Sequence, residues 1–261
     1  EVSVPTAYSV AGDGPPLIMI HGIGARRTTF DGMVAGLKDR FTCITYDLRG
    51  HGLTPWSGGR FDLDDLVDDL EELRARLGLA AAHIAGHSLG GMIGPRYAQR
   101  YPERVKSLGI WSTAAFRTED DSAKVRGVVA TMRERGIGPV LDTLTARWFT
   151  DAFRLSHPEM MDDVRRWILA NRKDVYAPIY QVLVDGVTEL VAPSPPIAAP
   201  TLVMTGDEDY GNSPAMSRAI AAEIAGSELV ILPGLRHMAL AEAPELFNAK
   251  LLNFLSRVQG G

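Results

Sequence analysis

Short apolar runs alternate with longer amphipathic stretches along most of the chain. The apolar runs cover residues 16–20, 41–46, 82–86, 105–111, 200–205 and 228–232. Runs of this length without polar alternation are typical of strands that are buried on both faces. Strands that alternate with helices predict a mostly parallel, doubly wound α/β sheet, whose reactive groups follow the carboxyl ends of its strands.

The clearest helix pattern covers residues 61–77. Six apolar side chains repeat there at helical spacing: Leu63, Leu66, Val67, Leu70, Leu73 and Leu77. The first turn carries aspartates and the last turn carries arginines, which is the charge order that the helix dipole favours.

The alternation stops between about residues 114 and 200. Helical patterns follow one another at 122–135, 140–148, 158–171 and 176–191, and a proline-rich return ends the stretch. We interpret this region as a helical lid inserted between the sixth and seventh core strands. The expected division is a core of residues 1–116 and 200–261 and a lid, or cap, of residues 117–199.

Composition narrows the class of protein. The net charge of −5 argues against nucleic acid and anionic membranes as partners. Because Cys43 is the only cysteine, the chain cannot form an internal disulfide, and we expect Cys43 to pack in the core. No apolar run is long enough to span a membrane and no signal-peptide pattern opens the chain, so we expect a cytoplasmic protein.

A nucleophile motif follows the third apolar run. The segment Gly86-His87-Ser88-Leu89-Gly90-Gly91 has the form G-x-S-x-G and precedes a helix pattern. In this context the serine lies on a sharp turn between strand and helix, where neighbouring glycines allow close packing. We predict Ser88 as the nucleophile and the backbone N–H of Leu89 as one donor of an oxyanion hole.

The other members of a Ser-acid-His triad are expected late in the chain. Three carboxylates, Asp207, Glu208 and Asp209, follow the run 200–205, and His237 follows the run 228–232. His237 also precedes a terminal helix pattern at 244–258, so its imidazole is placed to reach back over the sheet to Ser88. The pattern alone leaves the choice among the three carboxylates open.

Two further loops follow strands. A tight glycine turn after the run 16–20 predicts the N–H of Ile23 as the second oxyanion donor, with His21 orienting the loop. We interpret Asp47, Arg49 and His51, after the run 41–46, as loop-bracing residues without a catalytic role.

Taken together, these motifs resemble the α/β-hydrolase superfamily over nearly the whole chain, and within it the 3-oxoadipate enol-lactonase group. The likeness covers residues 86–92, 111–115, 146–150 with Phe153, and 242–247 with Leu251. In that group the acid stands three positions after the glycine of the late turn, which maps to Asp209. The chain departs at His21-Gly22, where typical enol-lactonases have Asn-Ser.

The resemblance implies an α/β-hydrolase fold with a helical cap and a small carboxylated enol-lactone as substrate. Trp148 lies in the segment most like the enol-lactonases, and we expect it to line the pocket. Arg147 beside it, or Arg26 on the oxyanion loop, is a candidate to bind a substrate carboxylate. No metal, nucleotide or prosthetic group is expected, and the oligomeric state is left open.

Three other functions fit the same motifs. The triad could cleave a carbon–carbon bond in meta-cleavage products, or it could hydrolyse simple carboxylic esters. A non-catalytic sensor with the same fold could use Ser88 and His237 to hold or trap a signal molecule. Ester turnover that depends on Ser88 separates the enzymes from the sensor.

Overall fold

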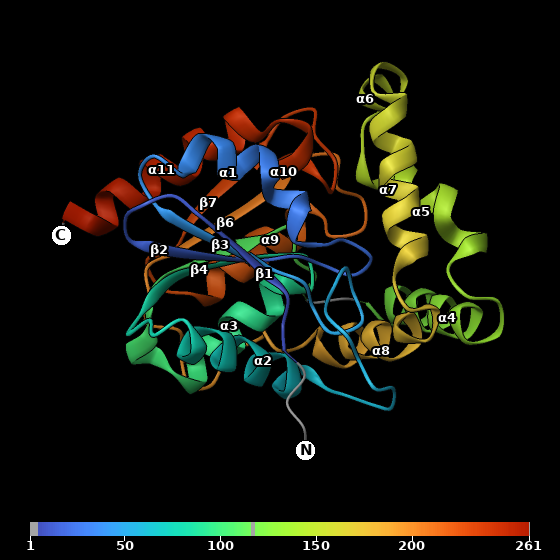
Figure 1. Cartoon of the computed structure of the whole chain (residues 1–261), viewed down its shortest axis with the longest axis horizontal. Coiled ribbons are helices and arrows are strands. Elements are labelled where there is room, and N and C mark those ends of the chain that lie inside the picture. The colour runs from blue at the N-terminus through green and yellow to red at the C-terminus, as the bar shows by residue number, and fades with distance from the viewer. Residues whose placement is uncertain (1–4, 116–117, 261) are drawn as a thin grey trace.

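The computed structural model describes residues 5–115 and 118–260. Within these residues, strands form one sheet in the order β1-β3-β2-β4-β5-β6-β7, and every neighbouring pair is parallel except β1 with β3. The strands are β1 (Tyr8–Ala11), β2 (Pro16–Ile20), β3 (Thr42–Tyr46), β4 (Ala82–His87), β5 (Val105–Trp111), β6 (Thr201–Gly206) and β7 (Glu228–Leu232). The predicted mostly parallel sheet of an α/β fold is therefore confirmed (Figure 1).

Helices connect the strands and build the lid. The α-helices are α1 (Asp31–Leu37), α2 (Leu63–Arg76), α3 (Gly90–Arg100), α4 (Glu119–Arg135), α5 (Leu141–Trp148), α6 (Asp151–Ser156), α7 (Pro158–Ala170), α8 (Tyr176–Gly186), α9 (Pro214–Glu223), α10 (Ala239–Glu242) and α11 (Pro244–Gly260). Four 3₁₀ turns are described as well: η1 (Arg27–Phe30), η2 (Pro102–Arg104), η3 (Gly138–Val140) and η4 (Lys173–Val175). In the part of the chain that is described, no helix combines the length and apolar character needed to cross a bilayer.

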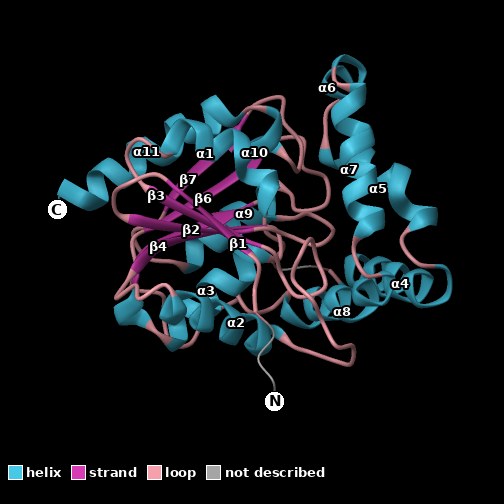
Figure 2. Ribbon diagram, in the orientation of Figure 1, coloured by secondary structure: helices cyan, strands magenta, loops and turns pink. Residues whose placement is uncertain are grey.

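Helices cover both faces of the sheet, as a doubly wound arrangement requires (Figure 2). On one face, α1 and α11 pack through residues such as Met33 and Phe247 against β2, β5 and β6. On the other face, α2 and α3 pack through Leu70 and Tyr97, in a core that continues into the lid. Cys43 is buried in the first of these cores, as expected.

The sheet differs from the expectation at its first strand. The sequence pattern gave no strand before Pro16, but β1 pairs with β3 as an antiparallel edge strand. Its residues are mostly exposed, so they do not form the buried apolar run that marks the other strands. The lid then follows β5 and precedes β6. The prediction that it lies between the sixth and seventh strands was therefore wrong by one strand.

The lid consists of helices α4 to α8, which gather at one end of the sheet (Figure 1). Helix α4 begins at Glu119 because the Thr118 side chain caps it by accepting a hydrogen bond from the Asp121 N–H. The six-residue helix α6 was not predicted, because so short an element shows no helical period. The expected boundary between core and lid at 116–117 lies outside the described residues.

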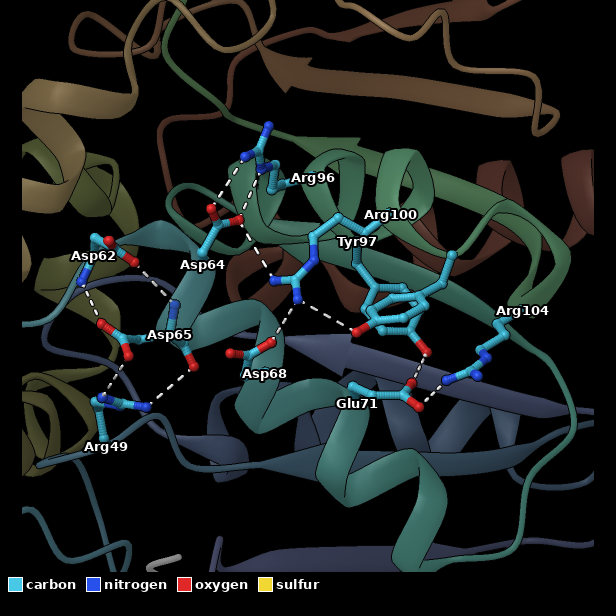
Figure 3. A network of polar contacts seen from close by, with 11 residues as sticks. Arg49, Asp62, Asp64, Asp65, Asp68, Glu71, Arg96, Tyr97, Arg100 and Arg104 are labelled. Atoms are coloured by element: carbon cyan, nitrogen blue, oxygen red, sulfur yellow. Dashed lines mark hydrogen bonds and ion pairs between the residues drawn. The ribbon is translucent and has the colours of Figure 1, made fainter. Parts of the chain in front are cut away.

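A network of arginines and carboxylates joins α2 to α3 (Figure 3). The Arg96 guanidinium donates to Asp64 at 2.9 Å, Arg100 donates to Asp68 at 2.8 Å, and the Tyr97 hydroxyl donates to Glu71 at 2.7 Å. Single exposed pairs of this kind contribute little stability, but several of them fix the mutual position of two helices. Because α3 starts at Gly90, two residues after Ser88, the network helps to hold the elbow in place.

Candidate active site

Ser88 occupies the sharp turn between β4 and α3. Its φ of 55° lies in the left-handed region that side chains other than glycine rarely adopt. The Ser88 N–H donates to the Trp111 carbonyl at 2.8 Å, which ties the turn to β5. A Cβ on Gly86 would lie 1.9 Å from the Gly90 carbonyl oxygen, so the turn closes only because that position has no side chain.

The loop after β2 lies directly against the elbow. A Cβ on Gly22 would lie 2.8 Å from the Ser88 Cβ, which places the next residue, Ile23, beside the serine. Leu89 precedes α3, and its carbonyl accepts the N–H groups of Met92 at 2.9 Å and Ile93 at 3.2 Å. The N–H groups at such a helix start lack intrahelical partners and favour a negative charge. The positions of Ile23 and Leu89 thus suit two oxyanion donors.

His237 and Asp209 meet across the turns that follow β7 and β6. The His237 Nδ1 lies 2.8 Å from Asp209 Oδ2. The other oxygen, Oδ1, accepts the N–H groups of Gly211 at 3.2 Å and Asn212 at 2.9 Å. With the proton on Nδ1, the His237 Nε2 carries a lone pair that can accept a proton.

The environment keeps the Asp209 carboxylate charged. Its side chain is 2% exposed, and burial alone would raise its pKa. The nearby His237 and the hydrogen bonds from His237 and Asn212 outweigh that burial, so the pKa of Asp209 lies below its usual range. A buried anion at this position stabilises an imidazolium on His237.

The two other late carboxylates lie elsewhere in their turn. Asp207 Oδ1 accepts the Gly234 N–H at 2.7 Å and so braces the turn after β7. Glu208 lies 3.6 Å from the Arg236 guanidinium at the surface. Of the three carboxylates that the sequence left open, Asp209 alone is bonded to His237 in the described structure.

One cavity of about 190 Å³ brings together most of the predicted site residues. Its lining includes Ile23, Ser88, Arg147, Trp148, Asp209 and His237. The rest of the wall is mainly lid side chains: Val125, Val128, Val140, Thr143, Leu144, Tyr180 and Leu183, together with Asn212. Leu89 is fully buried outside this lining, so only its backbone is available for the expected role.

The two candidate cations are in different places. Arg147 lines the cavity with its guanidinium against Gly211, and it has no carboxylate partner among the described residues. Arg26 lies outside the cavity lining, with its guanidinium over the Trp167 ring at 5.5 Å. A cation–π contact of this kind gives Arg26 a packing role, which leaves Arg147 as the candidate cation that lines the cavity together with Ser88.

Sequence reasoning missed the residues that hold His237 in position. His87, in the variable position of the elbow motif, donates from Nε2 to the His237 carbonyl at 2.7 Å. On either side of His237, Arg236 donates to the Ala146 carbonyl at 2.9 Å and the Met238 N–H donates to the Trp148 carbonyl at 2.8 Å. These contacts join distant segments, so local patterns do not reveal them.

The loops after β2 and β3 brace each other through His21, His51 and Asp47, as predicted, whereas Arg49 donates to Asp69 on α2 at 2.8 Å. His21 accepts the Leu48 N–H at 3.0 Å, and His51 accepts the Gly24 N–H at 3.1 Å. The buried Asp47 carboxylate accepts the N–H of Arg27 at 2.7 Å and that of Leu53 at 2.9 Å. These three side chains shape the loop under Ser88. No group of His, Cys, Asp and Glu in the described ranges is arranged to hold a metal ion.

Four buried histidines are held neutral. Burial lowers the pKa of His21 and His83 to about 4. Burial lowers the pKa of His51 and His87 to about 3, assisted by the neighbouring His21 and His237 respectively. Each of them therefore binds a proton far more weakly in the folded chain than in the unfolded chain, where a histidine titrates near 6.5.

These histidines predict a loss of stability in mild acid. Their contribution is fully present above pH 6.5 and is lost as the pH falls toward 4, because only the unfolded chain takes up the protons. Each such proton lowers the free energy of unfolding by about 1.4 kcal/mol per pH unit. Urea denaturation at pH 7 and pH 5 measures how much the free energy of unfolding falls per pH unit, which gives the number of protons taken up on unfolding. The variant His83→Gln should take up fewer, by at most one proton. Equal stability at both pH values would contradict this interpretation.

Comparisons with known proteins show the same fold. The family model described as alpha/beta hydrolase fold matches residues 15–244. The 3-oxoadipate enol-lactonase 2 of Acinetobacter baylyi is 28% identical over 248 residues, which cover 95% of this chain and 91% of the relative. Among solved structures, the enol-lactonase from Burkholderia xenovorans LB400 matches with a TM-score of 0.88 at 25% identity and covers 96% of each chain. A thermophilic esterase from Thermogutta terrifontis also matches with a TM-score of 0.88, at 26% identity, over 98% of this chain and 94% of the esterase.

Proposed function

The chain belongs to the α/β-hydrolase family, and on that premise we propose that it is a serine hydrolase that cleaves a small ester or lactone through an acyl-enzyme. The observation that carries the proposal is the arrangement around one cavity. Ser88, on a turn with φ of 55°, lines it together with His237, whose Nδ1 is bonded to the buried Asp209 at 2.8 Å. This combination suits a nucleophile, its base and the group that orients the base.

Acylation begins when the Ser88 hydroxyl oxygen attacks the carbonyl carbon of the substrate. His237 Nε2 takes the hydroxyl proton, while the carbonyl oxygen becomes an oxyanion that accepts the N–H groups of Ile23 and Leu89. Asp209 holds the proton on Nδ1 and stabilises the imidazolium. His237 then passes its proton to the leaving oxygen as the carbonyl–oxygen bond breaks, which leaves the acyl group on Ser88.

Deacylation repeats these steps with water. His237 takes a proton from the water as the water oxygen attacks the acyl carbon, and it returns that proton to the Ser88 oxygen as the ester bond to the enzyme breaks. The products are a carboxylic acid, which then ionises in water, and an alcohol, or a single ring-opened acid when the substrate is a lactone. The protein groups named here account for every proton transfer in the cycle.

The substrate we propose is a carboxylated lactone such as 3-oxoadipate enol-lactone. The likeness to two enol-lactonases supports this class. The position of Arg147 supports it as well, because this residue lines the same cavity as Ser88 and its guanidinium has no carboxylate partner in the described chain. A guanidinium matches the geometry of a carboxylate and binds it through two hydrogen bonds.

We therefore predict that the carboxylated lactone has a higher kcat/KM than its methyl ester. Replacing Arg147 by Gln should lower kcat/KM for the acid by about 10-fold to 100-fold, since a charge-assisted pair is lost, and should change the methyl ester far less. Steady-state kinetics on the two substrates measure the difference. Arg26→Gln is the matched control, because that cation lies outside the cavity lining.

A simple carboxylesterase is the second candidate, and the mainly apolar lid side of the cavity favours it. The likeness to an esterase at 26% identity supports it too. An assay panel of enol-lactones, aryl esters and vinylogous diketones separates lactone hydrolysis and simple ester hydrolysis from carbon–carbon bond hydrolysis. Activity confined to neutral aryl esters would exclude the carboxylated lactone and leave the serine hydrolase proposal intact.

A further inference from the structure

A second, larger cavity lies next to the catalytic one, under the lid. Its volume is about 690 Å³. Lid residues such as Phe149, Val164 and Trp167 form one side, and the opposite side is formed by residues around η1 and α10, such as Ala25, Thr28 and Ala241. The mechanism described above uses none of this space.

The two cavities share a wall, because residues close together in the chain line one cavity or the other. Ile23 lines the catalytic cavity and Ala25 lines the larger one. Likewise His237 lines the catalytic cavity and Met238 lines the larger one. Trp148 lines both cavities, so its indole is part of the partition itself.

The Trp148 side chain is held firmly in this partition. It is 6% exposed, and its Cη2 and Cζ2 would lie 3.5 and 3.8 Å from a Cβ on Gly24, so the ring edge rests over the oxyanion loop. Its carbonyl accepts the Met238 N–H at 2.8 Å. The Arg236 guanidinium donates to the carbonyls of Ala146 and Phe149, at 2.9 and 3.0 Å. The backbone on both sides of the indole is therefore fixed to the loop that carries His237.

The larger cavity has the chemistry of a site for an uncharged apolar chain. Much of its lining is aromatic, aliphatic or thioether side chain, including Trp148, Phe149, Met160, Val164, Trp167 and Met238. The charged groups in its described lining are the carboxylates of Asp31, Glu159 and Asp163, without a lysine or arginine. Carboxylates repel an anionic ligand, whereas moving an apolar chain from water into such a cavity lowers the free energy.

We propose that Trp148 is the specificity-determining residue for chain length: it closes the catalytic cavity against this ready-made apolar cavity and so restricts the enzyme to short substrates. The proposal rests on the serine hydrolase function proposed above. With the indole removed, the apolar chain of a longer ester can pass from Ser88 into the larger cavity. Each added methylene that is buried there then raises kcat/KM by up to about fourfold.

The test is a chain-length profile. Wild type and Trp148→Ala are assayed with p-nitrophenyl esters from acetate to dodecanoate, which lengthen the acyl side, and with acetates of n-alcohols, which lengthen the alcohol side. We expect wild type to favour short chains. In one of the two series, Trp148→Ala should raise the ratio of kcat/KM for the eight-carbon to the four-carbon chain by at least about tenfold. Trp148→Leu, which preserves more of the packing, should shift the profile in the same direction.

Two further variants make the result specific to the larger cavity. Trp167→Ala enlarges that cavity without opening the partition, so this variant should still prefer short chains. Thr28→Phe in the Trp148→Ala background fills the far side of the cavity and should cancel the gain for long chains. An unchanged profile in both Trp148 variants, or a gain that survives Thr28→Phe, would overturn the proposal. Ester turnover that persists in Ser88→Ala would instead refute the serine hydrolase function.

Discussion

Replacing Ser88 by Ala is expected to lower kcat for ester hydrolysis by at least about 10³-fold, because a triad works as a unit and the acyl-enzyme cannot form without the hydroxyl oxygen. The residual rate comes from the oxyanion donors and substrate binding. Steady-state kinetics with an activated aryl ester measure the loss. Intact mass after treatment with a phosphonate that labels serine hydrolases gives a second readout, since wild type should gain one adduct and the variant none.

Ser112→Ala is a matched control for this experiment. Ser112 also follows a strand of the sheet and has a φ of 48°, close to the 55° of Ser88. However, it lies outside the described lining of the catalytic cavity, and its hydroxyl contacts Thr205 at 3.4 Å. We expect the Ser112 variant to retain most of the activity. Near wild-type turnover by folded Ser88→Ala would contradict the proposal that Ser88 is the nucleophile.

Much of this site was predictable because its chemistry is local in sequence. The elbow needs glycines beside Ser88 to let β4, α3 and the Gly22 loop approach, and these glycines stand within a few positions of the serine or at the end of a strand. The order of the strands then places His237 at the same edge of the sheet. Both features depend on short segments whose pattern is visible without any knowledge of tertiary contacts.

The remaining features depend on contacts between distant segments. Asp207, Glu208 and Asp209 have equivalent chemistry in the sequence, and the turn geometry decides which one meets His237. The role of His87 also depends on tertiary structure, because its bond to the His237 carbonyl joins residues 150 positions apart. The sequence predicted helices in the lid, but the cavity that each helix lines depends on their packing.

Asp209→Asn is expected to lower kcat by about 10³-fold to 10⁴-fold through the wrong tautomer of His237. The amide oxygen can still accept the N–H groups of Gly211 and Asn212, so the turn should remain intact. The amide NH₂ then faces His237 Nδ1, which has to accept a hydrogen bond where it previously donated one. The proton moves to Nε2, and the imidazole can no longer take the proton of Ser88.

Asp207→Asn is the matched control, since it makes the same chemical change two positions away in the same turn. Asp207 accepts one hydrogen bond, from the Gly234 N–H, and an amide oxygen can accept that bond equally well. We expect kcat to fall by less than about threefold, as for a surface substitution that preserves its bond. Circular dichroism and urea midpoints establish that both variants are folded. If the large loss occurred in Asp207→Asn and the small one in Asp209→Asn, the acid that orients His237 would be assigned to the wrong residue, and the bond between Asp209 and His237 would have no role in proton transfer.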